Sequence, residues 1–397
     1  MSNLIIDNVT VFDGDSPDLL EGPVVIEDGV VTAVGERGQA GWPVLDGGGG
    51  TVVPGMIDAH FHAYGHSLSL LELEASRLSY TALAGAQRLS RALRRGFTTV
   101  RDVAGGDGGL ARAIAAGLME SPRYLFTGPA LSQTGGHGDG RPPHWDSCAL
   151  GGHTTEVVDG VDALRVATRD RFRQGAHAIK LLTSGGVVSP SDPLRIPQYS
   201  GSEIAAVCEE ARRVGSYVAA HAYSPEAIIH SVTNGVRSIE HGNLLDGATA
   251  TTMAELGVFL VPTLVTYDAM ARRGGDLGMP IVSRGKNQEV LDHARASLEI
   301  ALAAGVQLAF GTDLMGPLED EQLDGLRLQA EVIGILETLR SATSRGAQLL
   351  MEPDLGRLRP GARGDAVVLN GNPFEQPDML WSGPRYVVQG GKVVGGG

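Results

Sequence analysis

The chain has 397 residues, enough for one α/β barrel, which often spans about 250 residues as a single unit, together with a smaller domain. Hydrophobic residues make up 42% and charged residues 20% of the chain, which is typical of a compact globular protein and argues against disorder. The net charge of -14 is spread along the chain and no Lys/Arg-rich run occurs. Nucleic acid and anionic membrane surfaces are therefore not expected as partners.

The N-terminal segment alternates apolar and polar residues in LIIDNVTVF and PVVIEDGVVTAV, with Gly/Asp turns between them. This pattern predicts short antiparallel strands. The last 35 or so residues repeat it in DAVVLNG, RYVVQGG and KVVGG, so we expect both chain ends to pair in one small β-sandwich domain, residues 1–55 plus 358–397. The first residues lack a basic n-region and a long apolar h-region, which predicts a cytoplasmic protein.

Between the two ends, residues 56–357 alternate short apolar runs with longer helical patterns. The eight runs are 56–62, 97–103, 123–128, 178–185, 217–223, 238–243, 258–264 and 307–313. Helical patterns follow them, for example at 81–96, 200–215 and 224–235, with Ser or Thr at the start and Gly at the end. Eight successive βα units predict the α/β class and a (β/α)8 TIM-type barrel. An open doubly wound sheet is the alternative, but no GxGxxG turn follows the first strand. The glycines at 47–50 are expected to form a hinge into the barrel.

Reactive side chains gather at the ends of these predicted strands, where barrel enzymes place their active sites. His60 and His62 are two residues apart, so both side chains point to one face of a strand, and two imidazoles on one face suit a divalent metal of the zinc type. His221 and His241 each end an apolar run. Each one alone could be a buried core residue, but with the first pair they complete a ligand set. Asp313 is expected to be a metal ligand and a base, and the alternative is a helix cap.

Arginine supplies 29 of the 32 basic residues and only three are lysines, Lys180, Lys286 and Lys392, so a lysine kept inside an apolar strand calls for a reason. Lys180 lies between apolar residues in HAIKLLTSGG, where a charged ammonium would be costly unless it is paired. A desolvated lysine can lose its proton and react with carbon dioxide, and the resulting carbamate has two oxygens that could bridge a metal pair. The alternative is a salt bridge to Asp313.

Seven ordered segments carry a resemblance to a known family: PGMIDAHFH, RRGFTTVRDV, LSQTGGHGD, GAHAIKLLTSGGVVSPSDP, YVAAHAYS, VRSIEHGN and GTD. Over nearly its whole length the chain resembles the amidohydrolase superfamily, and within it the imidazolonepropionase-like branch that includes Xaa-Pro and Xaa-Arg dipeptidases. The resemblance implies an enzyme that hydrolyses an amide (C–N) bond of a small molecule by means of a metal-bridging hydroxide. The family often forms multimers, and the sequence leaves a homo-oligomer open.

The resemblance also implies roles for individual residues. His60, His62 and Asp313 would hold one divalent metal, expected to be Zn²⁺, and His221 and His241 a second, with carboxylated Lys180 bridging the two. His137, in TGGHGD, would meet a substrate carboxylate. Tyr223, in HAYS, would hold that carboxylate or polarise the carbonyl, and Asp313 would carry the proton to the leaving nitrogen. Arg195, in SDPLRIPQYS, lies in a loop that can reach substrate.

Several alternatives remain open at this point. The expected substrate is a dipeptide, a peptide with a free C-terminus or an N-acyl amino acid, and the runner-up is a cyclic amide, a carbamate or a urea-type amide. A binding protein on a degraded scaffold is the alternative from another class. The acidic segment LEDEQLDG could favour a cationic substrate or could simply be a solvated helix start, and Trp145 is a candidate for a pocket wall.

Overall fold

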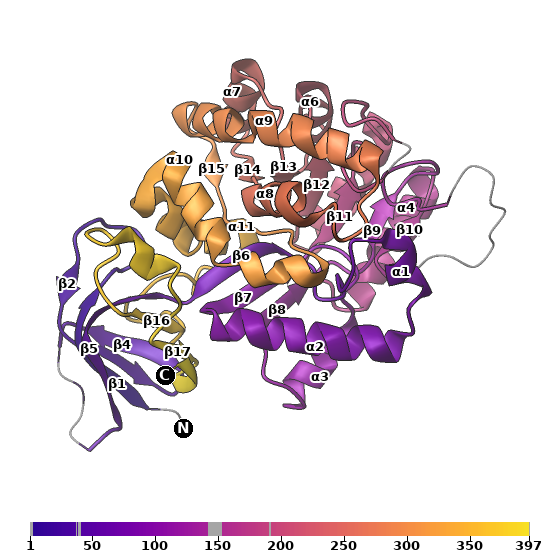
Figure 1. Ribbon diagram of the computed structural model, residues 1–397. Coiled ribbons are helices and arrows are strands. Elements are labelled where there is room, and N and C mark those ends of the chain that lie inside the picture. Colours follow the sequence, from indigo (N-terminus) through magenta and orange to yellow (C-terminus); the bar gives the residue numbers. More distant parts are fainter. Residues whose placement is uncertain (1–2, 37, 39–40, 142–152, 190–191, 397) are drawn as a thin grey trace.

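The computed structural model describes residues 3–36, 38, 41–141, 153–189 and 192–396. Trp145 lies outside these ranges. Figure 1 shows two parts: a β-rich region in which both chain termini lie, and a larger region of strands surrounded by helices. Several apolar clusters fill the two regions, and the largest lies between the parallel strands and their covering helices.

Both chain ends contribute to one eight-stranded sheet. Its strands are β1 (Leu4–Val11), β2 (Leu20–Glu21), β3 (Val24–Glu27), β4 (Val30–Val34), β5 (Val44–Pro54), β16 (Ala366–Leu369), β17 (Tyr386–Gln389) and β18 (Lys392–Gly396). Seven of them follow the order β18-β17-β16-β5-β1-β3-β4, with β2 paired to β1. The sheet joins the ends through antiparallel β5–β16 pairing, so the predicted pairing of the two ends is confirmed.

The glycines at 47–50 do not form the expected hinge. They lie inside β5, where the parallel register with β1 shifts between Asp7 and Val9. Gly48 and Gly49 have φ of 62° and 76°, which favours glycine because it has no Cβ. A run that looked like a linker is therefore an irregular part of a strand.

The larger region contains two parallel sheets. The first, in the order β6-β7-β8, consists of β6 (Met56–Phe61), β7 (Phe97–Asp102) and β8 (Arg123–Phe126). The second, in the order β10-β9-β11-β12-β13-β14-β15, consists of β9 (Ala130–Ser132), β10 (Thr155–Val157), β11 (Ile179–Leu182), β12 (Val218–Ala222), β13 (Ser238–His241), β14 (Phe259–Val261) and β15 (Gln307–Leu308). Each of the eight predicted runs contains a strand, although only Gln307–Leu308 of the run 307–313 is in strand form. Every residue of β6, β7, β11, β12, β13 and β14 is buried, as is typical of parallel strands covered on both faces.

Backbone hydrogen bonds connect the two sheets on both sides. On one side the Ala59 N–H donates to the Phe310 carbonyl (2.8 Å), and the Asp313 N–H donates to the His60 carbonyl (2.8 Å). On the other side the His177 N–H, just before β11, donates to the Phe126 carbonyl (2.7 Å). The carboxyl ends of strands from both sheets are thereby brought to the same place.

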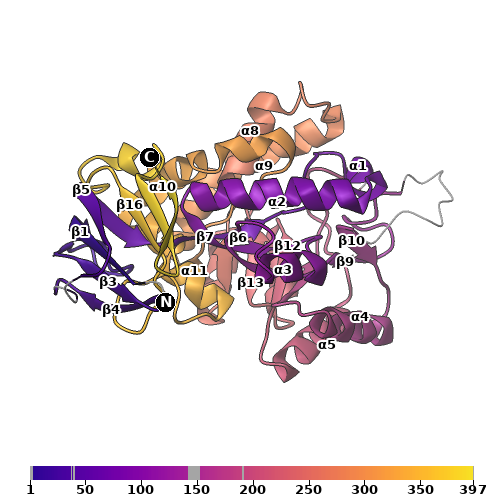
Figure 2. The same ribbon diagram turned by 90° about the horizontal axis from the view of Figure 1, so that it is seen from below.

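Helices cover these strands, with α8 and α9 on one side and α4 and α5 on the opposite side in Figure 2. They are α1 (Leu70–Ala75), α2 (Leu78–Arg94), α3 (Gly108–Ala115), α4 (Val161–Arg173), α5 (Gly201–Arg213), α6 (Pro225–Val232), α7 (Gly247–Glu255), α8 (Leu264–Arg273), α9 (Ile281–Ala303), α10 (Asp324–Ser341) and α11 (Ser344–Leu350), with 3₁₀ helices η1 (Gly316–Glu321) and η2 (Pro377–Leu380). Within the described residues, none of the helices is long and apolar enough to cross a membrane.

The predicted helix starts are partly confirmed. Ser200 caps α5 in a capping box with Glu203, and Ser224 caps α6, whose first residue is Pro225. The helix expected from residue 81 begins earlier, at Leu78, and its N-cap, Arg77, makes no side-chain capping bond. Its start therefore lacks the local signal on which the prediction depended.

Candidate functional site

A pocket opens at the carboxyl ends of the parallel strands. It is lined by eight of the polar residues singled out in the sequence: His60, His62, His137, Lys180, His221, Tyr223, His241 and Asp313. They come from β6, β11, β12, β13, the loop after β9 and the segment after β15. Residues separated by as much as 253 positions in the chain thus share one cavity.

His60, His62 and Asp313 form a compact group, in which one ligand atom from each lies within 4.8 Å of the others. Asp313 Oδ1 is 2.8 Å from His62 Nε2 and 3.4 Å from His60 Nε2. Burial alone would raise the pKa of Asp313, but the charge of His60 and hydrogen bonds from both histidines hold that pKa well below its usual range. The carboxylate is therefore ionised, as a metal ligand must be.

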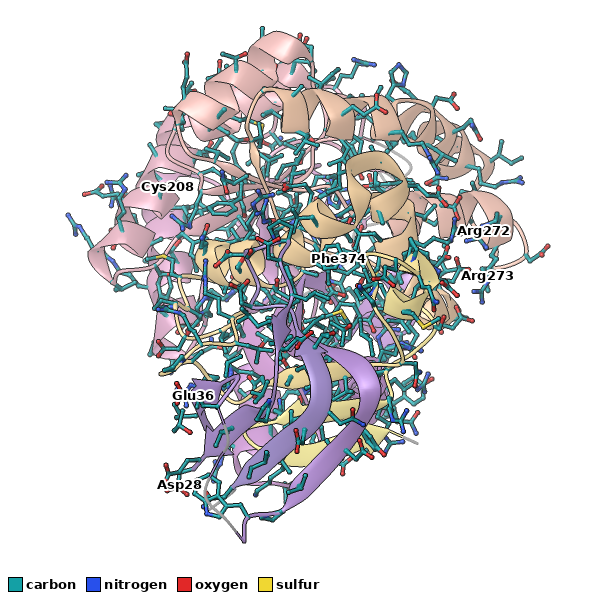
Figure 3. The ribbon with its side chains drawn as sticks, turned by 90° about the vertical axis from the view of Figure 1, so that its left-hand side faces the viewer. Asp28, Glu36, Cys208, Arg272, Arg273 and Phe374 are labelled. Carbon is teal, nitrogen blue, oxygen red and sulfur yellow. The ribbon has the colours of Figure 1, made fainter. Side chains whose placement is uncertain are left out.

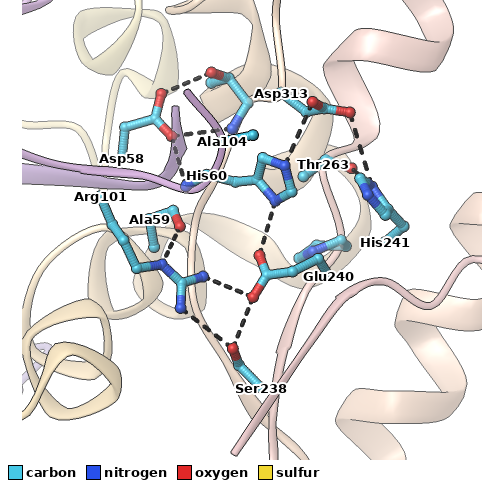
Figure 4. A network of polar contacts seen from close by, with 12 residues as sticks. Asp58, Ala59, His60, Arg101, Ala104, Ser238, Glu240, His241, Thr263 and Asp313 are labelled. Carbon is cyan, nitrogen blue, oxygen red and sulfur yellow. Dashed lines mark hydrogen bonds and ion pairs between the residues drawn. The ribbon is translucent and has the colours of Figure 1, made fainter. Parts of the chain in front are cut away.

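The His60 ring is held by a buried ion pair that sequence reasoning missed (Figure 4). His60 Nδ1 donates to Glu240 Oε2 at 2.8 Å, which leaves Nε2 to face Asp313. Glu240 Oε1 accepts from the Arg101 guanidinium at 2.7 Å, and both side chains are fully buried. A carboxylate behind a histidine fixes the tautomer and the ring orientation that a ligand needs. The sequence did offer a signal for this ion pair, because Arg101 is a charged residue within a predicted barrel strand, and charged residues are rarely buried unless they are paired.

His221 and His241 lie next to this group, with ring centroids 4.6 Å apart. The His241 ring is also 4.9 Å from the His60 ring, and its Nδ1 is hydrogen-bonded at 2.8 Å to the hydroxyls of Thr263 and Tyr267. Burial lowers the pKa of both His221 and His241 well below the ordinary value. They are therefore neutral imidazoles, the form that can bind a metal.

Lys180 lies among these groups and is only 3% exposed. Its Nζ has no hydrogen-bond partner among the described residues, so the alternative salt bridge to Asp313 is not formed. Burial lowers the pKa of Lys180 to about 8, although the charges of Glu240 and Asp313 act in the opposite direction. A buried amine without a hydrogen-bond partner among the described residues is unusual in a folded protein.

Three residues of the site have a backbone that only glycine adopts readily. His241 has φ of 76°, Asp313 of 54° and Thr263 of 47°. Such conformations cost about 1–3 kcal/mol each and cluster at functional sites. They let the His241 and Asp313 side chains turn toward the pocket at the point where the strands end.

His137 packs closely against two residues of the site. Its ring stacks on the His221 ring, with centroids 4.4 Å apart and an interplanar angle of 15°. Gly186 leaves room for the ring, because a Cβ there would be 2.0 Å from His137 Cε1. Its backbone N–H donates to Gln198 Oε1 at 3.0 Å, and its Nδ1 lies 3.6 Å from Asp192 Oδ2.

Tyr223 is buried beside His241, and its ring stacks at 5.1 Å on the His241 ring. Its hydroxyl is 2.9 Å from the hydroxyl of Tyr267, a residue of α8 that the sequence did not single out. Burial raises the pKa of Tyr223 far above its usual value, so the phenol keeps its proton. The hydroxyl can therefore donate a hydrogen bond to a bound molecule.

Arg195 does not line this pocket. It lies on the exposed side of the β11–α5 loop and forms an ion pair with Glu289 of α9, with N–O distance 2.9 Å. This geometry removes the basis for expecting it at the substrate, since its guanidinium already has a carboxylate partner away from the pocket.

The carboxylates of the acidic segment after Asp313 also form ion pairs with arginines of the same chain. Glu319 pairs with Arg88, Asp320 with Arg273, and Glu321 with Arg272 and Arg273; Figure 3 labels both α8 arginines. None of these carboxylates lines the pocket. The segment gives no support for a cationic substrate.

Comparisons with known proteins agree with this geometry. The sequence profile of the amidohydrolase family matches residues 51–394. An ochratoxinase of Aspergillus niger is 31% identical over 419 aligned residues, which cover 96% of this chain and 85% of the relative. Its crystal structure superposes with a TM-score of 0.87 at 28% identity, covering 100% of this chain and 96% of that one.

Two solved structures of peptidases are similarly close. A prolidase crystallised with N-methylphosphonate-L-proline is 41% identical, with a TM-score of 0.96 and 99% of each chain covered. A Xaa-Pro dipeptidase with methionine in its active site is 27% identical, with a TM-score of 0.88 and again 99% of each chain covered. The chain is thus an enzyme that belongs to the amidohydrolase family, in its Xaa-Pro dipeptidase-like branch.

Proposed function

We propose that this enzyme is a binuclear metal-dependent hydrolase of amide bonds, acting on dipeptides, on peptides from the C-terminus or on N-acyl amino acids. The observation that carries the proposal is the arrangement of neutral imidazoles and one ionised carboxylate around the unpartnered amine of Lys180. The resemblance to a prolidase, a Xaa-Pro dipeptidase and an ochratoxinase supports an amide next to a carboxylate-bearing unit.

The donor set fits two divalent metals, with zinc as the expected ion. His60, His62 and Asp313 would hold the first metal, since their ligand atoms already lie close together. His221 and His241 would hold the second, and Lys180, carboxylated at its buried Nζ, would bridge the pair. Imidazole and carboxylate donors are typical of zinc sites in hydrolases. When bound, the metals supply Lewis acidity and lower the pKa of a coordinated water.

The chain's own residues have separate tasks around the scissile amide. The protonated Tyr223 hydroxyl donates a hydrogen bond to the carbonyl oxygen, where negative charge develops. A water molecule attacks the carbonyl carbon, Asp313 accepts a proton from it, and the same proton passes to the nitrogen as the C–N bond breaks. His137 binds the substrate carboxylate. The ring stack of His137 on His221 supports this role, since His221 would be a ligand of the second metal.

We also propose that the two parallel sheets form one closed (β/α)8 barrel, residues 56–357, and that the chain ends form a β-sandwich domain, residues 1–55 plus 358–397. The hydrogen bonds that connect β6 with the segment after β15, and β8 with the residue before β11, support closure. In a barrel, catalytic residues from several strand ends meet at one face, which is what the pocket requires.

One observation favours a second candidate. Among the described residues that line the pocket, none is an arginine, and Arg195 pairs elsewhere. Recognition of a carboxylate would therefore depend on His137 and Tyr223 alone. A cyclic amide, carbamate or urea-type amide has no carboxylate beside the scissile bond and would fit the same centre.

Metal content and substrate choice can be tested together. The enzyme is grown with added zinc, its metals are counted by plasma mass spectrometry, and amine release is measured on Xaa-Pro dipeptides, N-acyl amino acids and their C-terminal methyl amides. We expect about two metals per chain and release only from substrates with a free carboxylate, with a KM that His137→Ala raises at least tenfold. Equal release from the methyl amides would favour the second candidate, and a metal-free active enzyme would contradict both.

A further inference from the structure

Lys286 of α9 is one of only three lysines in a chain that uses arginine almost everywhere else. Its ammonium donates to three backbone carbonyls of the β11–α5 loop: Gly186 at 3.0 Å, Ser189 at 2.7 Å, and Asp192. It also lies 3.7 Å from Asp192 Oδ1. An ammonium has three N–H groups, so these three carbonyls satisfy it completely.

This loop is fixed at its base but has no strand or helix in its described part. Ser184 and Pro197 form an isolated antiparallel bridge, and the Gln198 N–H donates to the Thr183 carbonyl at 2.8 Å. Beyond that base, α9 contacts the loop through Lys286, through Ser283, whose hydroxyl is 3.4 Å from the Val188 carbonyl, and through the exposed Glu289–Arg195 ion pair. Of the three, only Lys286 binds several backbone carbonyls of the loop.

The loop determines the position of His137. Gly186 packs against one face of its ring, and Asp192 faces its Nδ1. Gln198 accepts from the His137 backbone and donates through Nε2 to Asp192 Oδ2 at 3.2 Å. Two of the three carbonyls held by Lys286 belong to Gly186 and Asp192, which lie next to the His137 ring.

We infer that Lys286 is a positioning residue: by binding three carbonyls of the β11–α5 loop it holds Gly186 and Asp192 against His137, and so sets the recognition of the substrate carboxylate. The inference rests on the proposed function of His137. Arginine cannot replace this lysine, because a planar guanidinium directs its N–H groups as a fork and cannot aim them at three carbonyls around one point. This requirement explains why position 286 is a lysine in a chain that otherwise uses arginine almost everywhere.

The kinetic test uses Lys286→Met and Lys286→Arg, with Arg284→Met as a control that removes an exposed charge from the same helix. The probe is the Xaa-Pro dipeptide that the wild type hydrolyses fastest. We expect both Lys286 variants to raise KM about tenfold, with kcat within twofold and zinc content unchanged, while Arg284→Met behaves as wild type. Rescue of KM by Lys286→Arg, or an equal loss in Arg284→Met, would overturn the inference.

A double-mutant cycle then asks whether the effect acts through His137. In a His137→Ala background, Lys286→Met should add less than a twofold further rise in KM. A second full tenfold rise would show that Lys286 acts independently of His137 and would overturn the inference.

Hydrogen exchange measured by mass spectrometry gives a readout that needs no activity. Peptides covering residues 184–189 and 192–199 should exchange faster in both Lys286 variants than in the wild type or in Arg284→Met. Unchanged exchange would overturn the positioning role. If the wild type hydrolyses none of the dipeptides, the proposed function fails, and the exchange experiment still decides whether Lys286 holds the loop.

Discussion

Gly186 is a glycine because the His137 ring occupies the space in which a Cβ would lie. A Cβ at this position would be 2.0 Å from His137 Cε1 and 2.3 Å from its Nδ1. Side-chain atoms do not approach so closely, so the ring would have to leave its stack on His221. The sequence motif LLTSGG thus contains a steric requirement of the pocket.

We therefore predict that Gly186→Ala raises KM for carboxylate-bearing substrates at least tenfold and leaves the zinc content at the wild-type level, as steady-state kinetics and metal analysis would show. The matched control is Gly247→Ala at the start of α7, where a Cβ would meet no atom within 4 Å. Wild-type KM in Gly186→Ala would contradict the proposed place of His137 in substrate binding.

For individual residues, the sequence indicated the side chains that line the pocket but not the residues that hold those side chains in position. His60, His62, His221, His241, Asp313 and Lys180 could be found because each ends a predicted strand or lies inside one. Asp192, Tyr267 and Lys286 come from a loop and from helices far along the chain, and no local pattern connects them to a strand end. Only the folded arrangement shows their contacts.

Strands β7 and β13 belong to different sheets, and the buried pair of Arg101 and Glu240 links them. Arg101 also donates to the Ala59 carbonyl of β6 at 2.6 Å, and Ser238 donates to Glu240 at 2.7 Å. Removing one member of such a pair leaves the other charge buried without compensation, at a cost of about 3–5 kcal/mol. The pair also orients His60, so a stability change and a metal-affinity change should occur together.

We predict that Glu240→Gln lowers the free energy of unfolding of the metal-stripped enzyme by about 3 kcal/mol and weakens zinc binding at least tenfold. Urea denaturation and zinc titration against a competing chelator measure the two effects. Glu289→Gln is the control, because the exposed Glu289–Arg195 pair should contribute less than about 1 kcal/mol. A Glu240→Gln enzyme as stable as the control would show that the pair is not needed to join the sheets.

The alternation of apolar runs and helical patterns was sufficient to predict eight of the ten parallel strands. It did not reveal β9 (ALS) and β10 (TEV), because neither stands in an apolar run that is visible in the sequence, and β10 has no fully buried position. The glycine run within β5 was misleading for another reason. Its strand form depends on pairing with β1 and β16, which are partners that local sequence does not encode.

For the whole molecule, the proposed metal ligands connect parts of the chain that are far apart. They come from β6, β11, β12, β13 and the segment after β15, so bound metals would join both parallel sheets at their carboxyl ends. A ligand that binds only the folded state stabilises it by about 2.7 kcal/mol at a concentration of one hundred times its Kd. For 397 residues, with an unfolding entropy of about 2.1 cal/mol/K per residue, this corresponds to a rise in Tm of roughly 3 °C.

We predict that chelation abolishes hydrolysis and lowers Tm by at least about 3 °C, and that two equivalents of zinc restore both. Differential scanning calorimetry on stripped and reloaded enzyme measures the change. His60→Asn should lose most of the zinc-dependent rise because it removes one ligand of the first metal, whereas His293→Asn, at an exposed position of α9, should keep it. If Tm is the same with and without zinc in the wild type, the pocket residues do not hold metals in the folded state, and the proposed chemistry fails with them.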